Sequence, residues 1–307
     1  MKKLHKRYKR FPISANLDSR QKDSLIRNLM LFPSVIALVG IMIPFAIGVF
    51  TSMTDRKLYE SSFHFVFLQN YLSNFGNETF LISLANTLTY TVCAMALQLV
   101  AGMLVVALLD IRSRLQTFMR TVVIFPLLIP PIVSSLMWKT MLQPSSGVIN
   151  YLLSRIGVAP GTWLTGLNTA LPTLILMDTW VYLPFTSIIL LAGVQSLPED
   201  IIESGRIDGA TGIQQFLYLK LPWMKKYFIL TMLFRICDSL KAFELIYSTT
   251  KGGPMNATRT LNILAYEEAF RWSNIGTAQS IIFTLWILAF IVSSFLLKLW
   301  NKQAEEL

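Results

Sequence analysis

Six apolar segments, each long enough to cross a lipid bilayer as a helix, constrain the fold of this chain more than any other feature. They cover residues 29–51, 79–109, 121–142, 170–194, 227–246 and 273–297. A helix needs ~20 apolar residues to span the hydrocarbon core of a bilayer. The whole chain is 53% hydrophobic and only 14% charged, against ~25% charged residues in a soluble domain. We therefore expect an all-α polytopic membrane protein with six transmembrane helices.

The basic residues are unequally divided between the two ends of these segments. Nine lysines and arginines precede residue 29, and nine more fall in the second and fourth connections and the C-terminal end, whereas the other connections hold six. Cytoplasmic loops carry the excess of basic residues, so both termini are expected to be cytoplasmic. The net charge of +10 is then a sign of topology and not of nucleic-acid binding. The expected organisation is a basic cytoplasmic tail at 1–28, a transmembrane domain at 29–300 and a short cytoplasmic tail at 301–307.

The sequence lacks the motifs of an enzyme or a metalloprotein. Its two cysteines, Cys93 and Cys237, lie in apolar segments, and its two histidines, His5 and His64, lie far apart. No Cys/His metal spacing, phosphate-binding glycine loop or nucleophile elbow is present. We expect no metal, no cofactor, no nucleic-acid partner and no catalysis by the chain itself.

The connection between the fourth and fifth segments, residues 196–226, has the features of two short helices. Ser196 with Glu199, and Thr211 with Gln214, have the spacing of capping boxes. Gly209 is a plausible end for the first helix. The second is expected to end at 221–222, because a residue before proline is pushed out of helical geometry.

This connection is also too apolar for a solvated loop. Its apolar side chains that require cover are Ile201, Ile202, Ile207, Ile213, Phe216 and Leu217. The residues alone leave two interpretations: an amphipathic element that lies in the lipid interface, or a docking surface for a cytoplasmic partner.

The same stretch resembles the signature loop of the permeases of ABC importers, which reads E-A-A, three residues, G, nine residues, I-x-L-P. Glu203, Ser204 and Gly205 match its start, Gly209 matches the glycine, and 219–222 matches its end. In that family the loop is the coupling helix, which sits in a cleft of the ATP-hydrolysing subunit. The resemblance favours docking and implies that the coupling residues are Glu203, Ser204, Gly205, Asp208, Gly209, Ala210, Leu221 and Pro222.

A second set of motifs is similar to the carbohydrate-uptake permeases of the maltose and glycerol-3-phosphate type. It consists of the stretch 241–254 followed by Thr258, Thr260, Leu261, Tyr266, Ala269 and Phe270, together with Trp138, Pro144, Gly147, Asn150, Asn86 and Thr87. The resemblance covers about residues 70–297.

These resemblances imply the permease subunit of an importer for a sugar or oligosaccharide, in a bacterial or archaeal plasma membrane. They imply four kinds of partner besides membrane lipid: a second homologous permease, two ATP-binding cassette subunits, an extracytoplasmic solute-binding protein and the carbohydrate. The turn at 252–254 and the stretch 144–168 lie where the binding protein would dock. The alternative from another class is a gradient-driven secondary transporter or channel, which would explain intramembrane charges but not the signature between Glu203 and Pro222.

Charges within the apolar segments are costly and should face a cavity or a partner. Arg235, Asp238, Lys241 and Glu244 are spaced three residues apart in the fifth segment. On one helix they would form a self-paired ladder or a polar wall of the translocation path, and both can hold. We favour Asp238, Lys241 and Glu244 for the path, and expect Arg235 to snorkel towards the inner interface.

Four further residues complete the candidates for the path. Asp178, with Trp180 and Tyr182, could offer an aromatic face to a sugar ring, or the aromatic pair could belong to an interfacial belt. Asn86 could contact the solute or hydrogen-bond between helices.

In the third segment, the prolines at 126, 130 and 131 are expected to kink the helix.

Overall fold

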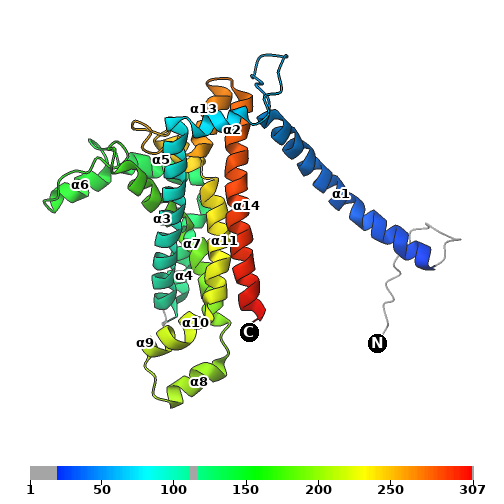
Figure 1. Cartoon of the computed structure of the whole chain (residues 1–307). Coiled ribbons are helices and arrows are strands. Elements are labelled where there is room, and N and C mark those ends of the chain that lie inside the picture. The colour runs from blue at the N-terminus through cyan, green and yellow to red at the C-terminus, as the bar shows by residue number, and fades with distance from the viewer. Residues whose placement is uncertain (1–18, 111–115, 306–307) are drawn as a thin grey trace, which may run out of the picture. The chain divides into compact units, whose positions relative to one another are not determined.

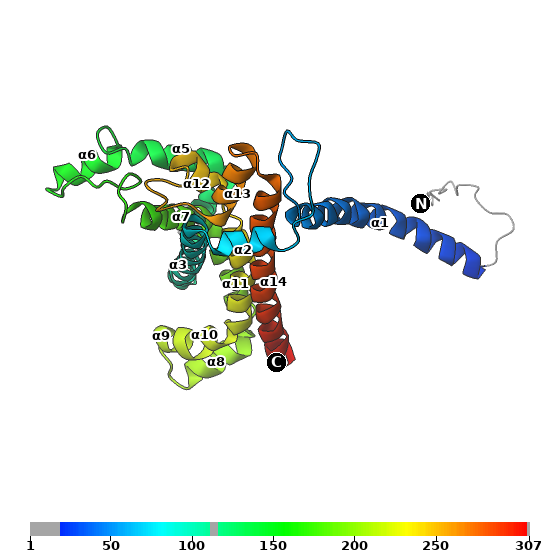
Figure 2. The same ribbon diagram turned by 45° about the horizontal axis from the view of Figure 1, so that its top comes forward.

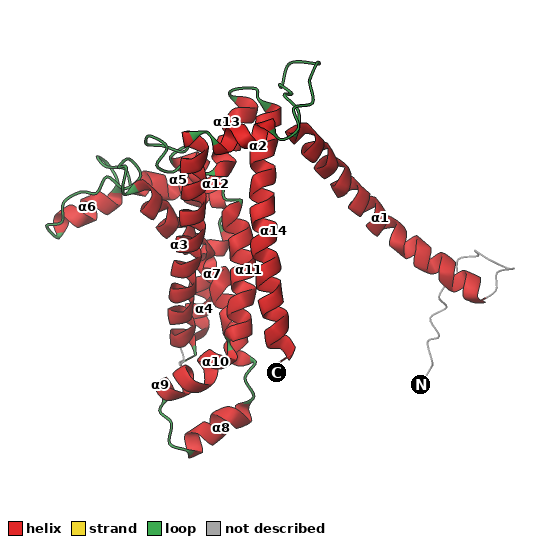
Figure 3. Cartoon of the chain, viewed as in Figure 1, coloured by secondary structure: helices red, strands yellow, loops and turns green. Residues whose placement is uncertain are grey.

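The computed structural model describes residues 19–110 and 116–305, and within those ranges every named element is a helix (Figure 3). In chain order the elements are α1 (Ser19–Ser52), α2 (Gln69–Phe75), α3 (Glu78–Leu109), α4 (Gln116–Ile124), the 3-10 helix η1 (Phe125–Leu128), α5 (Pro131–Met141), α6 (Val148–Arg155), α7 (Ala170–Gln195), α8 (Glu199–Ile207), α9 (Gly212–Gln215), the π-helical turn η2 (Phe216–Lys220), α10 (Leu221–Trp223), α11 (Lys225–Leu240), α12 (Glu244–Thr249), α13 (Leu261–Phe270) and α14 (Ile275–Glu305).

The chain divides into two units, residues 1–50 and 51–307. In the first unit the described part is α1, whose apolar stretch begins at Met30 and continues to Ser52. Residues 1–18 of the expected basic tail lie outside the described residues, whereas the expected C-terminal tail continues α14 as far as Glu305.

The second unit is a helical bundle in which α3, α7, α11 and α14 run side by side (Figure 1). Three of its helices, α3, α7 and α14, are long and apolar enough to cross a membrane, and α1 is a fourth in the chain. Figure 2 shows α8, α9 and α10 grouped at the end of the bundle where α14 finishes, with α2 and α13 near the opposite end. The bundle therefore has short helices at both ends, joined by longer apolar helices.

The close contact between α3 and α7 depends on a glycine. A Cβ atom at Gly102 would lie 2.7 Å from Cγ2 of Thr186. Small residues let helix backbones approach closely where lipid supplies no hydrophobic driving force. Gly102 therefore sets the distance at which α3 and α7 pack.

The third apolar segment is bent, as its prolines predict, and the bend is sharp. The residues 118–128 and Pro131–Met141 meet at 97°. Ile129 and Pro130 are extended, with ψ of 124° and 138°, and Pro131 is the first residue of α5. A residue before proline avoids the helical region, and a proline is well tolerated in the first turn of a helix, so consecutive prolines both end one helix and start the next.

The fifth apolar segment is not one helix, which corrects the expectation of a continuous ladder of charges. Helix α11 ends at Leu240, Lys241 is its C-cap, and α12 begins at Glu244. The side chain of Asn262, from α13, donates to the carbonyl oxygen of Leu240 at 3.3 Å. This contact satisfies one of the carbonyls that a helix end leaves without a partner, so the break is stabilised from a distant part of the chain.

Three polar side chains in the bundle interior connect α3, α7 and α11. Arg235 donates from Nε to Oε1 of Gln98 at 2.6 Å and from Nη2 to Oδ2 of Asp178 at 3.0 Å. Gln98 donates to the same oxygen of Asp178 at 2.7 Å. We call Gln98, Asp178 and Arg235 the polar triad.

The triad corrects one expectation and gives Asp178 its partners. Arg235 does not snorkel, because it is only 1% exposed and ranks among the most completely buried large side chains of the described residues. Asp178 is equally enclosed and accepts hydrogen bonds from a helix that the sequence did not connect to it. A buried charge is tolerated where an opposite charge and further hydrogen bonds compensate it, and the triad supplies both.

Asp178→Leu is expected to lower the free energy of unfolding by about 3–5 kcal/mol, because it leaves the Arg235 guanidinium buried without its counter-charge. Asp178→Leu combined with Arg235→Leu should recover most of that loss, since no charge then remains buried. The measurement is denaturant unfolding of the protein in mixed micelles.

Asp238→Asn is the control, because Asp238 is 48% exposed on its side chain and lies 3.8 Å from Arg235. Because the Asp238 carboxylate itself remains open to solvent, its loss should cost about 0–1 kcal/mol. If Asp178→Leu destabilises the protein no more than Asp238→Asn does, the triad does not hold the bundle together.

Candidate functional site

The segment between α7 and α11 opens with helix α8, whose start differs from the expectation. Pro198 is the residue before the helix, and Glu199 and Asp200 occupy the first turn. Ser196 does not cap α8. It closes α7, donating to the carbonyl oxygen of Gly193 at 2.8 Å. Acidic residues in the first turn still favour the start of α8, through the partial positive charge of its N-terminus.

The end of α8 is as predicted, at Gly209. Its φ of +79° lies in the left-handed region that glycine occupies without a Cβ penalty. The N–H of Gly209 donates to the carbonyl of Arg206 at 3.0 Å, and that of Ala210 to the carbonyl of Gly205 at 2.9 Å. These two bonds form a Schellman motif, which reverses the chain sharply after α8.

Gly205 is the point where α8 meets the helical run that follows it. Gly205 is buried, and a Cβ atom there would lie 2.8 Å from Cδ1 of Leu219. By contrast, Glu203, Ser204 and Asp208 are exposed. The small residue therefore packs inward, and its charged and polar neighbours face outward.

The second capping box is present. The N–H of Thr211 donates to Oε1 of Gln214 at 2.8 Å, and the N–H of Gln214 donates to Oγ1 of Thr211 at 3.4 Å. The end predicted at Pro222 is wrong, because helix continues through α9, η2 and α10 to Trp223. The N–H of Leu221 bonds to the carbonyl of Phe216, and this wider π-type turn removes the clash that a proline makes in a regular α-helix.

Two contacts attach this segment to the membrane bundle. The ammonium of Lys220 forms an ion pair and a hydrogen bond with Asp110, the C-cap residue of α3. The indole of Trp223 donates to Oγ of Ser196 at 3.1 Å. A role for Asp110 was not predicted from the sequence. The available signal was its position directly after an apolar segment, within reach of a basic loop.

Of the apolar residues that were expected to require cover, Ile207, Ile213 and Leu217 are exposed, whereas Ile201, Ile202 and Phe216 are half-buried. Ile207 is 86% exposed, Ile213 75% and Tyr218 74%. Gly209, Ala210 and Tyr218 also line a cavity of about 370 Å³ on this surface. Exposed apolar patches of this kind, with polar residues around them, mark interaction sites. We call residues 196–226 the coupling segment.

The path candidates separate into two groups. Asp178 and Tyr182 belong with the triad, because the Arg235 guanidinium lies 3.9 Å from the centre of the Tyr182 ring. Trp180 packs edge-on against Trp138 with ring centres 5.5 Å apart. Both aromatic side chains are half-buried.

The second group, Asp238, Lys241 and Glu244, lies at the break between α11 and α12. All three are exposed, Lys241 by 65% of its side chain, and Lys241 pairs with Asp238 at 3.6 Å. The break in the helix therefore leaves three charged side chains exposed beside the bundle.

Asn86 has a structural role that its position in an apolar segment did not reveal. Its side-chain amide donates to the carbonyls of Asn256 at 2.8 Å and Arg259 at 3.1 Å. Its neighbour Thr87 accepts from the N–H of Leu261 at 2.9 Å. Together they fix the loop before α13 and the first turn of that helix.

Among the described residues, no group of three or more His, Cys, Asp and Glu residues is arranged to hold a metal ion.

Two relatives cover most of the chain. A trehalose/maltose transport system permease protein from Thermococcus litoralis is 32% identical over 286 residues, which are 90% of this chain and 95% of the relative. A probable ABC transporter permease protein from Sinorhizobium fredii is 35% identical over 260 residues, 83% of this chain and 84% of the relative.

The fold is that of a solved bacterial ABC transporter involved in the import of the acidic polysaccharide alginate. One chain of that structure matches with a TM-score of 0.81 and 21% identity, over 92% of this chain and 96% of the other. The family described as "Binding-protein-dependent transport system inner membrane component" matches residues 98–304, which include both the triad and the coupling segment. The chain therefore belongs to this family and is a permease subunit of an ABC importer.

Proposed function

We propose that this chain forms part of the translocation path for a sugar or oligosaccharide that an extracytoplasmic binding protein delivers. The observation that carries the proposal is the coupling segment, with its exposed Ile207, Ile213 and Tyr218 at one end of a bundle of apolar helices. The trehalose/maltose relative, which shares 32% identity over 90% of the chain, supports a carbohydrate as the solute.

The proposed topology has six spans with both termini in the cytoplasm of a bacterium or archaeon. Four apolar helices and the bent pair that ends at Met141 account for five. Helix α11 is shorter, with 16 residues, and with α12 it would form the broken sixth span. Broken helices are tolerated at membrane depth where they line a cavity. The proposed domains are the tail 1–28, the permease domain 29–300 and the tail 301–307.

The proposed partners are a second homologous permease and two ATP-binding cassette subunits. The ATP-binding subunits would dock on the coupling residues Glu203, Ser204, Gly205, Asp208, Gly209, Ala210, Leu221 and Pro222. Movement of the segment would reach α3 through the Lys220–Asp110 pair and α7 through Trp223 and Ser196. No covalent chemistry falls to this chain, because ATP is hydrolysed by the separate subunits.

For the path itself we propose Asp238, Lys241 and Glu244. Their exposure beside a helix break supports this role, since charged groups in a membrane bundle face a watery cavity or a partner. The turn at 252–254 and the stretch 144–168 would contact the binding protein.

The alternative, a gradient-driven transporter, would need an ion site of its own and would leave the exposed coupling segment without a function.

Gly209→Glu is expected to abolish ATP-dependent uptake while the chain still inserts into the membrane. A glutamate side chain strains a backbone at positive φ and projects a charge from the docking surface. Co-purification of the ATP-binding subunit should be lost together with uptake.

Gly157→Glu is the matched control. Gly157 also has positive φ, +77°, and open space around it, as Gly209 does, but it lies in the loop after α6. It should leave co-purification of the ATP-binding subunit unchanged. Equal loss of that subunit in both variants would remove the special role of the coupling segment.

Lys241→Gln and Glu244→Gln are each expected to reduce uptake at limiting solute by about tenfold, because a charged hydrogen-bonding group facing the solute contributes ~1.5 kcal/mol or more. ATPase co-purification should stay intact, and so should stability. The measurement is solute uptake into proteoliposomes, and Lys57→Gln, an exposed loop residue paired with Glu60, serves as the control. Uptake equal to that of Lys57→Gln would exclude both residues from the path.

A further inference from the structure

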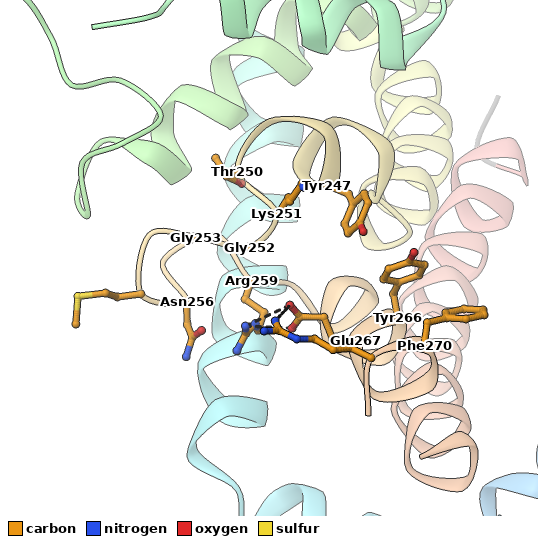
Figure 4. A pocket seen from close by; sticks show the side chains of 12 residues that line it. Tyr247, Thr250, Lys251, Gly252, Gly253, Asn256, Arg259, Tyr266, Glu267 and Phe270 are labelled. Carbon is orange, nitrogen blue, oxygen red and sulfur yellow. Dashed lines mark hydrogen bonds and ion pairs between the residues drawn. The ribbon is translucent and has the colours of Figure 1, made fainter. Parts of the chain in front are cut away.

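A cavity of about 550 Å³ lies between α12, the loop that follows it and α13, towards the end of the bundle opposite the coupling segment (Figure 4). Ligand pockets in proteins have volumes of roughly 300–1,000 Å³, so there is room for one or two sugar rings. Neither the triad nor the coupling segment contributes a residue to it.

One wall of the cavity is aromatic. Tyr247, Tyr266 and Phe270 follow one another, with ring centres 4.9 Å apart for the first pair and 5.0 Å for the second. The hydroxyl ends of Tyr247 and Tyr266 point towards one another (Figure 4). Aromatic rings that combine an apolar face with a polar end suit a sugar ring, whose C–H face is apolar and whose edge carries hydroxyls.

The charged groups of the cavity are predominantly cationic. Lys251, Arg259 and Arg271 line it together with a single carboxylate, that of Glu267. Glu267 lies between the two guanidiniums, 3.0 Å from Nη2 of Arg259 and 3.7 Å from Nη1 of Arg271. One carboxylate cannot neutralise three cations, so the cavity keeps an excess of positive charge that favours an anion.

The wall that carries these groups is held in place from α3. The Asn86 amide bonds the carbonyls of Asn256 and Arg259, and Thr87 accepts from the N–H of Leu261 at the start of α13. A site whose walls are fixed before binding loses less entropy on binding. The contacts from α3 therefore fix this wall of the cavity before any ligand binds.

We infer that this cavity is a binding site for an anionic carbohydrate, a sugar that carries a carboxylate or a phosphate. The ring would stack on Tyr266 and Phe270, and its acidic group would be bound by Arg271 and Lys251, because guanidinium and ammonium groups form their strongest hydrogen bonds with such oxyanions. The inference rests on the proposed function, since it assigns a class of sugar to a carbohydrate permease.

The test uses the complete permease complex with its ATP-binding subunits, in nanodiscs of zwitterionic lipid and without the binding protein. Glucuronate, glucose 6-phosphate and glucose are titrated, and binding is followed by saturation-transfer NMR. Binding of glucuronate or glucose 6-phosphate, in preference to glucose and weakened by added salt, is the expected result. Comparison of the two anions shows which acidic group the site takes.

Arg271→Gln should weaken binding of the preferred anion by about tenfold, the effect of one charge-assisted hydrogen bond. Phe270→Ala should weaken it as well, through loss of the stacking surface. Both side chains are exposed, so neither change is expected to disturb folding. Arg56→Gln, an exposed arginine in the loop after α1, is the control and should bind as the unmodified complex does.

Absence of any binding, binding of glucose equal to that of the anions, or equal effects of Arg271→Gln and Arg56→Gln would each overturn the inference. Uptake of a neutral sugar is measured in parallel in proteoliposomes that hold the permease with its ATP-binding subunits. Such uptake would show that the proposed function stands even when the inference about the cavity fails. Loss of the ATP-binding subunits from the unmodified complex would instead contradict the proposed function.

Discussion

The cost of a buried charge in a membrane protein determines how this bundle is assembled. The Arg235 guanidinium is enclosed within the helical bundle, and its stability there depends on Asp178 and Gln98. The three residues come from α11, α7 and α3, so a mismatch in the packing of any two helices would leave a charge without its partner. The triad thus makes the relative placement of three helices a condition of stability, because a buried charge that loses its partner is costly.

The coupling segment presents the opposite case to the buried charge, because its backbone is held in place while apolar side chains such as Ile207 stay exposed. Local features supply the rigidity: the Schellman turn at Gly209, the capping box at Thr211 and the tight packing of Gly205 against Leu219. Lys220 and Trp223 then join it to α3 and α7, the same two helices that the triad ties to α11. A displacement of the segment would therefore act on helices that are already connected to one another.

Local chemistry was predictable from the sequence, whereas contacts between distant residues were not. Four of the apolar spans, the proline bend, the glycine stop at 209 and the capping box at Thr211 are present, and they depend only on residues close in the chain. The partner of Arg235 lies 57 residues away in sequence, so its burial could not be inferred from spacing within its own helix. The break after Leu240 depends on Asn262, and the helix through Pro222 depends on a π-type turn that no residue pattern announces. The local structure of the coupling segment was therefore easier to predict than the exposure of Asp238, Lys241 and Glu244, which lie at a break that the sequence pattern does not reveal.

The central claim is that residues 196–226 are the contact with an ATP-hydrolysing partner, and site-specific photo-cross-linking tests it most directly. A photoreactive residue replaces Ile207, which is 86% exposed in the coupling segment, or Ile156, which is 73% exposed after α6 at the other end of the bundle. After irradiation in intact membranes, the cross-linked proteins are identified by mass spectrometry. A cross-link from position 207 to a protein with a phosphate-binding glycine loop, and none to that protein from position 156, is the predicted result. A cross-link to that protein from position 156, or none from position 207, would contradict the account.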